Sequence, residues 1–370
     1  MENEPIRILN IVPNMRAAGI ETFIMNIYRN IDRKKVQFDF LVHNEKEEFY
    51  DKEINDLGGR IYRLTYKDDK NIFKYIKDLN DFFKGHKEYK IVHGHMQSMM
   101  PIYLYIAKKN KVSIRIAHSH NNSYEKSIKG FLLHILSRFS RLFANVKFAC
   151  SKDAGVYLFG KNKKFEVINN GINIEKFVYN LDFREKIRNN LGLTENEILI
   201  GNVGRMEKQK NQLFLIDCFK ELTKLKNNYK LLIIGEGSLN DKIIKRIKKH
   251  NIQDKVLLLK NVKNVNEYMQ AMDIFALPSL YEGLGIVLIE AQMSGLKCFT
   301  TKDKVAKETN ITDNIYYLPL EKKVWVNNLS KIEKYDRNRK IELLGKKFDI
   351  NCIAKSLQDK YLKYNEIGEN

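Results

Sequence analysis

The stretch ILIGNVGRMEKQKN, residues 198–211, indicates how this chain folds. A short run of apolar, largely β-branched side chains leads into Gly204, and a basic loop follows. From residue 212 to residue 225, apolar side chains recur with helical spacing. A buried strand, a glycine-containing loop and a helix in this order are typical of a βαβ unit.

The same alternation runs through the chain on both sides of this stretch. Apolar β-branched runs predict strands at residues 6–12, 38–43, 60–64, 90–95, 113–118, 146–150, 165–168, 230–234, 256–259, 273–277 and 297–300. Amphipathic stretches predict helices at residues 19–30, 71–83, 98–109, 128–143, 241–250 and 284–294. Strands that alternate with helices favour parallel sheets, with ligands beyond the carboxyl ends of the strands.

The length of 370 residues favours two domains, because single domains cluster at about 100–200 residues. The alternation stops at a turn signal, Asn169–Gly171, continues through a polar stretch, and restarts near residue 198. We therefore expect two Rossmann-like domains, at residues 1–174 and 175–349. The tail predicts helices, and a terminal helix at 350–370 is expected to pack back on the first domain.

Composition excludes several classes of protein. No run reaches the roughly 18 to 20 apolar residues of a membrane span, and the N-terminus lacks the features of a signal peptide, so we expect a cytoplasmic protein. The four cysteines are far apart, which indicates free thiols in a reducing compartment. The net charge of +20 attracts anionic partners, although a lysine-rich composition is also typical of AT-rich genomes.

The loop after the strand 198–203 is a candidate phosphate site. Gly204 lets the backbone approach a ligand closely, Arg205 offers a forked guanidinium, and Lys210 adds a point charge. Both cations are placed to converge on one diphosphate at the carboxyl end of the strand. The alternative is two exposed cations on a basic surface.

A second candidate site begins after the strand 273–277. There a loop with Glu282 leads through Gly283, Leu284, Gly285 and Ile286 into an apolar helix, whose free N–H groups favour an anion. Further along this helix, Glu290 is the only charged side chain among apolar neighbours. A buried carboxylate needs hydrogen-bond donors, and sugar hydroxyls are suitable ones. The alternative is one helix-capping acid and one glutamate in a salt bridge.

The motif Gly204-Arg205-x4-Lys210 followed by Glu282-x7-Glu290 resembles the signature of retaining glycosyltransferase family 4, which has the GT-B fold. The resemblance covers nearly the whole chain, and further matching segments occur in the expected order. They are Ile11-Val12-Pro13 with Ala18-Gly19-Ile20-Glu21, Ala117-His118-Ser119-His120-Asn121, Ala149-Cys150-Ser151, Ile168–Asn173 through Phe177, and Lys304–Glu308. The second and last of these resemble the branch that builds bacterial capsular polysaccharides and exopolysaccharides.

The resemblance implies a fold and a set of roles. Two Rossmann-like domains would face each other across a cleft, with the N-terminal one binding the acceptor and the C-terminal one the nucleotide sugar. Arg205 and Lys210 would bind the donor diphosphate and stabilise the leaving group, and Glu290 would accept from the ribose hydroxyls. Glu282 would contact the donor sugar, with the backbone of residues 283–286 near sugar and phosphate.

In the first domain the resemblance implies two further contacts. Gly19 would line the cleft against the diphosphate, and His118 would lie near the reacting sugar. The family usually has two glycines in the first loop, whereas this chain has Ala18-Gly19.

Two His-x-His pairs end neighbouring predicted strands, His93 with His95 and His118 with His120. Strand alternation puts both members of a pair on one face, which makes metal ligation geometrically possible. Because no cysteine or clear acid joins them, lining of the substrate cleft is favoured, and structural histidines remain an alternative.

Metal-dependent transferases of the other major fold use an Asp-x-Asp loop, and none is convincing in this chain. Asp68-Asp69 lies in a polar turn with no strand leading into it. We therefore expect no metal and no cofactor, the nucleotide sugar being a substrate.

Residues 126–147 form a candidate membrane surface, because five basic and no acidic residues lie there. The basic residues are Lys126, Lys129, Arg138, Arg141 and Lys147. On a helical wheel one side gathers Ile128, Phe131, Leu132, Ile135, Leu136, Phe139, Leu142 and Phe143. Either this helix lies on an anionic membrane, or it packs its apolar side on the sheet.

Together these features predict transfer of a hexose or N-acetylhexosamine, with retention, from a nucleotide sugar, with UDP-sugars favoured. The acceptor would be lipid-linked or a saccharide, in bacterial surface polysaccharide biosynthesis at the inner face of the cell membrane. The alternatives are a nucleotide-sugar epimerase of the same fold and a glycosyltransferase with a protein acceptor. No nucleic-acid partner is expected, because no recognition module accompanies the positive charge.

Overall fold

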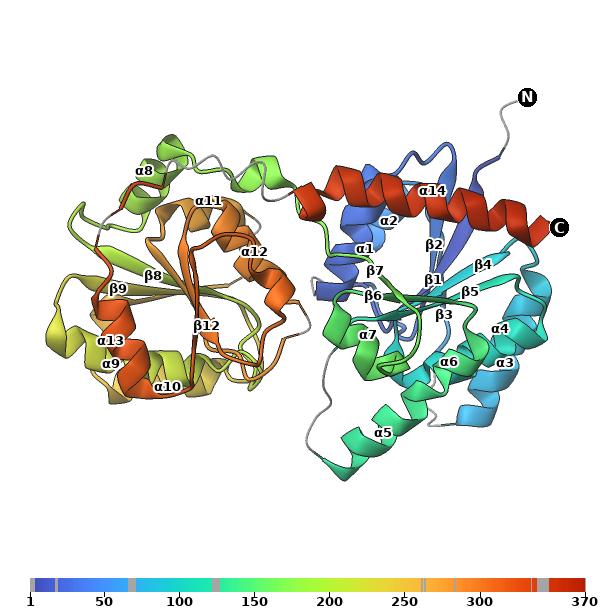
Figure 1. Ribbon diagram of the computed structural model, residues 1–370, viewed down its shortest axis with the longest axis horizontal. Coiled ribbons are helices and arrows are strands. Elements are labelled where there is room, and N and C mark those ends of the chain that lie inside the picture. Colours follow the sequence, from blue (N-terminus) through green and yellow to red (C-terminus); the bar gives the residue numbers. More distant parts are fainter. Residues whose placement is uncertain are drawn as a thin grey trace. The chain divides into compact units, whose positions relative to one another are not determined.

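The computed structural model describes residues 4–16, 19–65, 71–121, 127–260, 262, 264–282, 284–333, 335–337 and 346–369. Contacts divide the chain into two compact units (Figure 1). Unit 1 contains Met1–Ile172 and Lys347–Asn370, and unit 2 contains Asn173–Lys346. These bounds lie within three residues of the domain boundaries expected from the sequence.

Unit 1 is a seven-stranded parallel sheet in the order β3-β2-β1-β4-β5-β6-β7. Its strands are β1 (Ile6–Ile11), β2 (Val36–Val42), β3 (Ile61–Arg63), β4 (Ile91–Gly94), β5 (Ile114–Ser119), β6 (Val146–Ala149) and β7 (Glu166–Val167). Its helices are α1 (Gly19–Asn30), α2 (Asp51–Asp56), α3 (Ile72–Gly85), α4 (Met100–Lys109), α5 (Ile128–Arg138), α6 (Ser140–Phe143), α7 (Lys152–Phe159) and the terminal α14 (Ile350–Glu369).

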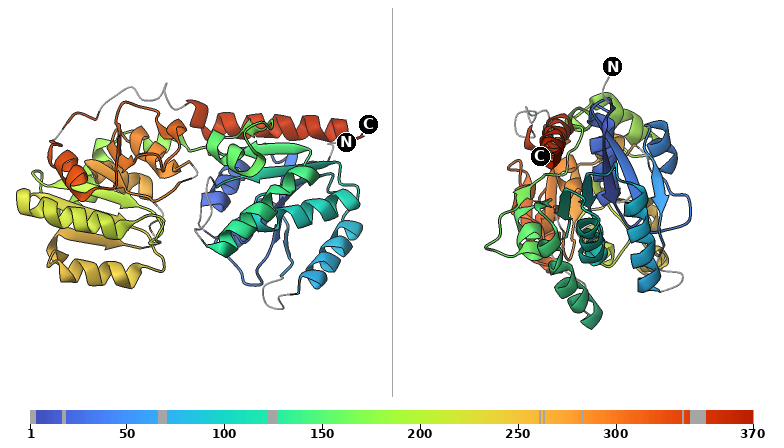
Figure 2. Two further views of the ribbon diagram at one scale, coloured as in Figure 1. Left: turned by 60° about the horizontal axis from the view of Figure 1, so that its bottom comes forward. Right: turned by 90° about the vertical axis from the view of Figure 1, so that its right-hand side faces the viewer.

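Helices cover both faces of this sheet because its strands are apolar on both faces (Figure 2). On one face Ile8, Phe38 and Ile116 pack with Phe23 of α1 and Leu357 of α14. On the other face the strands pack against α3 and α4. The terminal helix thus completes the core of the first domain, as the sequence predicts.

Unit 2 has the same architecture, with six parallel strands in the order β10-β9-β8-β11-β12-β13. The strands are β8 (Ile198–Val203), β9 (Tyr229–Ile234), β10 (Val256–Leu259), β11 (Ile274–Leu277), β12 (Lys297–Thr301) and β13 (Ile315–Leu318). The helices are α8 (Leu181–Asn190), α9 (Gln212–Leu225), α10 (Asn240–Lys249), α11 (Val265–Ala271), α12 (Ile286–Met293) and α13 (Lys322–Ser330). Apolar clusters fill the space on both faces of this sheet as well.

The strand order confirms the predicted fold class of two Rossmann-like α/β domains. In each unit the chain order reverses beside the first strand, between β1 and β4 and between β8 and β11. A crevice opens outside the carboxyl ends of the strands at such a switch point, and ligands of doubly wound sheets bind there. Residues that bind ligands are therefore expected in the loops that follow these four strands.

Two expectations about individual segments need correction. The predicted helix at 128–143 is two helices, α5 and α6, because the N–H of Phe139 bonds to Leu136 and tightens the last turn of α5. The polar stretch after residue 173 contains α8, which begins where Asn180 accepts from the Phe183 N–H. Asp68-Asp69 lies outside the described residues.

Candidate active site

The loop after β8 brings Gly204 and Lys210 together. Gly204 has a φ of 157°, and a Cβ built there would lie 3.2 Å from Cε of Lys210. The glycine therefore leaves room for the lysine stem beside the end of the strand. Arg205, the next residue, is exposed and makes no ion pair or side-chain hydrogen bond within the described residues.

Lys210 meets Glu282, which lies 72 residues later in the loop after β11. The Lys210 Nζ donates to Oε1 of Glu282 over 2.6 Å, and both side chains are largely buried. Ser279 Oγ donates to the same carboxylate oxygen, also over 2.6 Å. This pair joins the two loops that flank the switch point of unit 2. Lys210, which the sequence analysis assigns to the donor diphosphate, is thus ion-paired and largely buried, and the alternative of an exposed cation does not hold for it.

Backbone contacts hold the same two loops together. The Leu280 N–H donates to the Gln209 carbonyl over 2.8 Å, and the Gln209 side-chain amide donates to the Tyr281 carbonyl over 2.9 Å. The Glu282 N–H donates to the carbonyl of Lys304, in the loop after β12. The segments that carry the predicted donor-site residues are therefore adjacent at one edge of the sheet.

The helix α12 starts at this edge. Gly285 precedes it with a φ of 75°, a left-handed conformation that a glycine adopts without strain. Leu284 is buried beneath the turn, and Ile286 is the first helical residue. The free N–H groups of the first turn favour an anion at this end of the helix. Gly283 lies outside the described residues.

Glu290 lies in α12 and is only partly exposed. Its carboxylate has no hydrogen-bond or ion-pair partner within the described part of the chain. Burial among apolar neighbours raises the pKa of Glu290 to about 7. A carboxylate in this state gains stability from any hydroxyl group that donates to it.

The sequence analysis missed one loop at this edge, Gly235-Glu236-Gly237-Ser238 after β9. A Cβ on Gly235 would lie 2.1 Å from the Gly204 carbonyl oxygen, and one on Gly237 would lie 2.5 Å from the Met206 carbonyl oxygen. Ser238 Oγ donates to Glu207 over 2.7 Å. The two glycines let this loop press against the loop that carries Arg205. The motif Gly235-x-Gly237, directly after a predicted strand, could have identified this loop from the sequence.

In unit 1 the structure places His118 on β5 and gathers it with His93, His95 and His120. His93 Nε2 and His118 Nδ1 are 3.1 Å apart, and His95 Nδ1 and His120 Nε2 are 2.9 Å apart. The exposed surface of His118 is 0%, so its ring is a buried group in this unit and not one that lines an open surface.

The four imidazoles are held in the neutral form. Burial and the neighbouring rings lower the pKa of His93, His95 and His118 well below the ordinary value, and burial lowers the pKa of His120 to about 3. Ring nitrogens of His93, His95 and His118 lie within 4.8 Å of one another, a spacing from which a metal ion can be bound.

Gly19 is the first residue of α1 and is exposed. A Cβ added to it would meet no atom within 4 Å, so nothing inside unit 1 requires a glycine there. The preceding Ala18, where the chain departs from the usual two glycines, lies outside the described residues.

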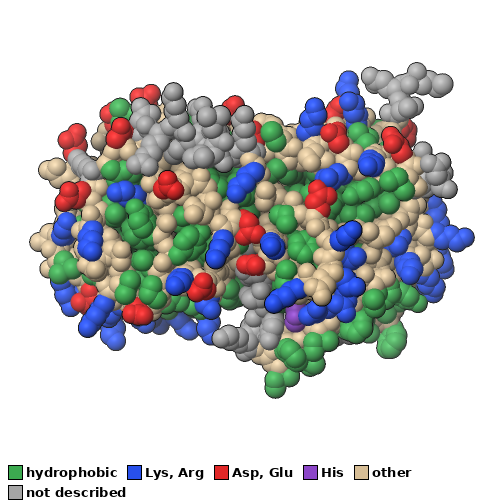
Figure 3. Space-filling model, in the orientation of Figure 1, with side chains coloured by type: hydrophobic (Ala, Val, Ile, Leu, Met, Phe, Trp, Pro, Cys, Tyr) green, Lys and Arg blue, Asp and Glu red, His purple; other side chains and the backbone are tan. Residues whose placement is uncertain are grey.

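The helices α5 and α6 expose their apolar side. Ile128 is 83% exposed, and Leu132 and Leu142 are each 59% exposed, whereas Ser137 and Ser140 face inward. The alternative that this segment packs its apolar side on the sheet is therefore wrong. Figure 3 shows hydrophobic side chains grouped at the lower edge of the view, where α5 lies in Figure 1. Lys126 and the side chain of Lys129 lie outside the described residues.

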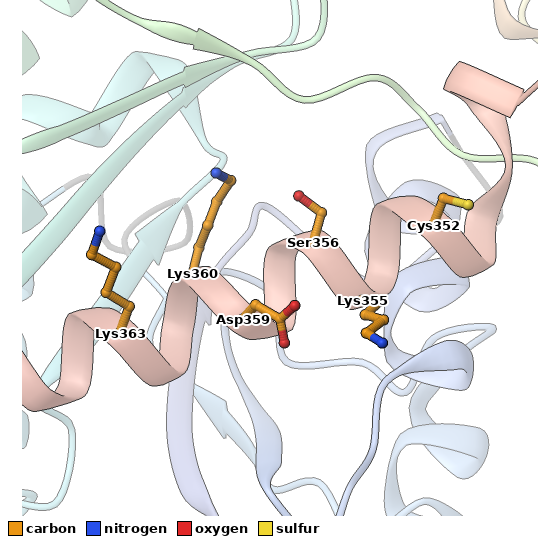
Figure 4. A pocket seen from close by; sticks show the side chains of 6 residues that line it. All are labelled: Cys352, Lys355, Ser356, Asp359, Lys360 and Lys363. Carbon is orange, nitrogen blue, oxygen red and sulfur yellow. The ribbon is translucent and has the colours of Figure 1, made fainter.

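A hollow of about 510 Å³ lies along α14 (Figure 4). It is lined by side chains of this one helix, among them Lys355, Lys360 and Lys363. Lys360 is paired with Glu166 over 2.8 Å. Because no fully buried polar group lines the hollow, it has none of the features of the edge in unit 2. No helix among the described residues is both long and apolar enough to cross a membrane.

Two family profiles together match most of the chain. The profile described as Glycosyltransferase Family 4 matches residues 17–176, and the one described as Glycosyl transferases group 1 matches residues 183–339. A putative glycosyltransferase, EpsF of Bacillus subtilis (strain 168), is 32% identical over 80% of this chain and 79% of its own length. The chain belongs to the glycosyltransferases of this group 1 and family 4 type.

Other relatives of this glycosyltransferase support the same assignment. The capsular polysaccharide biosynthesis glycosyltransferase CapH of Staphylococcus aureus is 25% identical, over 96% of this chain and 99% of the relative. The UDP-Gal:alpha-D-GlcNAc-diphosphoundecaprenol alpha-1,3-galactosyltransferase of Escherichia coli is 30% identical, over 62% of this chain and 63% of the relative.

Among solved structures, HepE of Anabaena in complex with UDP and glucose superposes on this glycosyltransferase with a TM-score of 0.80. The alignment covers 96% of this chain and 99% of HepE at 18% identity, and it shows that the two share the GT-B fold.

Proposed function

We propose that this glycosyltransferase moves a hexose or N-acetylhexosamine from a UDP-sugar to a lipid-linked or saccharide acceptor, with retention, in the synthesis of a bacterial surface polysaccharide. The observation that carries the proposal is the edge of unit 2, where Arg205, the Lys210–Glu282 pair and the start of α12 follow the two strands at the switch point. The relatives from Staphylococcus aureus and Escherichia coli and the UDP complex of HepE motivate the substrate classes.

In this proposal unit 2 binds the donor. The unpaired Arg205 and the cation of Lys210 contact the diphosphate, whose negative charge also lies at the positive end of α12. Glu290 accepts from the ribose hydroxyls, and the backbone of residues 283–286 lies near sugar and phosphate.

Glu282 has two tasks in this arrangement. Its carboxylate holds Lys210 in place in the absence of donor and accepts from a sugar hydroxyl when donor is bound. Unit 1, with the terminal helix, binds the acceptor.

The chemistry required of the protein is stabilisation of a leaving nucleoside diphosphate. Two cations and a helix N-terminus supply this without a metal ion, because groups fixed in advance favour charge where it develops. Retention is proposed through front-face displacement, in which the acceptor hydroxyl attacks from the side of the departing diphosphate. Neither a metal nor another cofactor is included in the proposal.

The relatives do not favour the epimerase alternative, since those compared above are glycosyltransferases. A protein acceptor differs from the proposal only in the acceptor, and the experiment below separates the two.

We further propose that α5 and α6 rest on the anionic inner face of the cell membrane, where a lipid-linked acceptor is found. The exposed apolar side chains of these helices lie in a segment with Arg138 and Arg141 and no acidic residue between 126 and 147. An amphipathic helix of this kind buries its apolar side at the headgroup boundary and gains about 1 kcal/mol for each basic residue near anionic lipid.

The donor proposal is tested with purified protein and a panel of UDP-, GDP- and ADP-sugars, in the presence of EDTA. We expect selective binding and slow hydrolysis of one UDP-sugar, weakened in Arg205→Ala and in Glu290→Ala and indifferent to EDTA. Transfer is then assayed with polyprenyl-diphosphate sugars, free saccharides and a peptide as acceptors. Donor binding that neither substitution weakens would contradict the proposed site, and transfer to the peptide alone would favour the protein acceptor.

The membrane proposal is tested by co-sedimentation with vesicles of phosphatidylcholine, with and without phosphatidylglycerol. We expect binding only to the anionic vesicles, lost in Leu132→Asp. The matched control is Phe73→Asp, which adds the same charge at an 81% exposed apolar position on α3. Equal loss in both variants would mean that added negative charge, and not the apolar surface of α5, explains the effect.

A further inference from the structure

Ser279 lies in the loop after β11, three residues before Glu282, and its side chain is 0% exposed. Its hydroxyl donates to Oε1 of Glu282 over 2.6 Å, and the same oxygen accepts from Lys210 Nζ over 2.6 Å. A distance of about 2.5–2.7 Å is typical of an O–H group bonded to a charged carboxylate, and such a bond is stronger than one between neutral groups. The hydroxyl therefore holds one oxygen of this carboxylate firmly in place.

The backbone on either side of Ser279 is fixed by other groups. Thr300 Oγ1 donates over 2.9 Å to the carbonyl of Leu277, at the end of β11. The backbone N–H groups of Leu280 and Glu282 donate to carbonyls in the loops after β8 and β12. Because none of these bonds involves the Ser279 side chain, the hydroxyl fixes the side chain of Glu282 and not the path of the loop.

The position of the Lys210 ammonium group depends on the same carboxylate. Within the described residues its Nζ donates to no acceptor besides Glu282. The stem of a lysine is flexible, so this one acceptor decides where the charge lies. An ammonium group has three N–H donors, and those that are not used on Glu282 can reach a further ligand. A group that orients the carboxylate therefore also orients the donors that Lys210 offers.

We propose that Ser279 is a positioning residue, whose hydroxyl orients the Glu282 carboxylate and, through it, the ammonium group of Lys210. The hydrogen bonds that carry this inference lie entirely within unit 2. That the ammonium group then meets the diphosphate of a donor rests on the function proposed above. Ser279 itself touches no substrate in this assignment, and its effect on the reaction passes through Lys210.

The role of Ser279 is tested first with Ser279→Ala, which removes the hydroxyl and little volume. The matched control is Ser294→Ala, the same change at another 0% exposed serine of unit 2, whose hydroxyl donates to a backbone carbonyl and not to a carboxylate. A displaced cation stabilises the charge that develops on the leaving diphosphate less well. We therefore expect kcat to fall about tenfold in Ser279→Ala, with donor KM changed less than about twofold, and both values to be retained in the control.

A second substitution covers the case in which Ser279→Ala is too unstable to assay. Ser279→Cys has a similar size and a weaker donor, so we expect it to fold and to lose kcat in the same direction but to a smaller extent. A cysteine variant with the kcat of the unsubstituted enzyme would overturn the proposal in that case.

A further comparison separates positioning from a general effect on the fold. In Lys210→Met/Glu282→Gln the charged groups through which Ser279 acts are absent. Ser279→Ala added to this background should therefore change kcat by less than about twofold. A serine that only stabilises the loop would instead cost about the same tenfold factor in both backgrounds, and that result would overturn the positioning role.

The position of Lys210 can also be measured without catalysis. The full-length folded protein is treated with a limited amount of acetic anhydride, and acetylation of Lys210 is followed by mass spectrometry. The Lys210 side chain is paired and 15% exposed, so we expect slow acetylation in the unsubstituted protein and in Ser294→Ala, and severalfold faster acetylation in Ser279→Ala. An unchanged rate in Ser279→Ala would overturn the proposal.

The outcomes of these experiments separate this proposal from the proposed function. If Lys210 is acetylated faster in Ser279→Ala but the unsubstituted protein neither binds a nucleotide sugar nor transfers one, Ser279 positions Lys210 and the function proposed above is wrong. If the protein transfers sugar and Ser279→Ala keeps both kcat and the acetylation rate, the function stands and the positioning role is wrong.

Discussion

At the switch point of unit 2 the loops carry charges, whereas at the switch point of unit 1 the strand ends carry neutral imidazoles. Arg205 is exposed and unpaired within the described residues, and Lys210 forms an ion pair with Glu282. In unit 1, His93 and His118 are buried and linked by hydrogen bonds. Two parallel sheets of similar strand order thus present different groups at their switch points, charged side chains in unit 2 and neutral imidazoles in unit 1.

The difference follows from burial. Loops after the strands of unit 2 extend to solvent, where a guanidinium keeps its charge at little cost. The imidazoles of unit 1 lie within the sheet and under α1 and α14, where a charged ring would cost several kcal/mol. The same difference predicts opposite responses to substitution and to pH in the two units.

The largest expected effect is at the charged edge. In Lys210→Met we expect kcat/KM to fall about 10²- to 10³-fold, because the variant lacks the cation that we propose stabilises the leaving diphosphate. The substitution also removes the cation that pairs with the buried Glu282, which costs about 3–5 kcal/mol of folding stability. Steady-state kinetics and urea unfolding measure the two losses.

Two further variants separate charge from stability. The double variant Lys210→Met/Glu282→Gln also removes the negative charge of residue 282. We expect it to recover most of the folding stability that Lys210→Met loses, but not the kcat/KM. Lys208→Met, an exposed lysine of the same loop, should change neither. If the double variant recovered activity together with stability, Lys210 would only stabilise the fold. The charged edge of unit 2 would then not differ from unit 1 in a way that matters for catalysis.

Most of the fold was predictable from the sequence because parallel strands, buried on both faces, read as continuous apolar runs. The edge strand Ile315–Leu318 was missed, since its Tyr316 is exposed and its run is short. The helix α8 was missed because its composition is polar and few of its side chains, such as Ile187, face the core.

The candidate site was predictable in its residues but not in its contacts. The motifs with Arg205, Lys210 and Glu290 could be read along the chain, because glycines and charges stand next to strand ends. The Lys210–Glu282 pair spans 72 residues and the His93–Tyr361 contact spans 268, so they depend on how distant segments pack. No local pattern carries that information.

The next largest expected effect is a loss of folding stability at acidic pH, caused by His120 in unit 1. The folded-state pKa of His120, about 3, is far below the ordinary value near 6.5, so below pH 6.5 the unfolded chain binds the proton first and stability falls with pH. For His120 alone this amounts to about 3 kcal/mol between pH 7 and pH 4. Urea midpoints measured across this range should decline less steeply in His120→Asn, and parallel declines would contradict the burial argument.

The smallest expected effect is a change in folding stability and donor KM as the pH rises and Glu290 in unit 2 ionises. Its pKa of about 7 in the folded state exceeds the ordinary value near 4.5, so the folded protein holds this proton more tightly and the contribution to stability is lost as pH rises from about 4.5 through 7. Glu290→Gln cannot ionise and should lack this decline. Ionisation has the opposite effect on donor binding, because a charged carboxylate accepts from ribose hydroxyls more strongly, by about 1 kcal/mol. The donor KM of the unsubstituted enzyme should therefore fall about three- to fourfold between pH 6 and pH 8 while its folding stability declines, and both slopes should vanish in Glu290→Gln. A KM slope that persists in the variant would assign the titration to another group and separate Glu290 from the ribose.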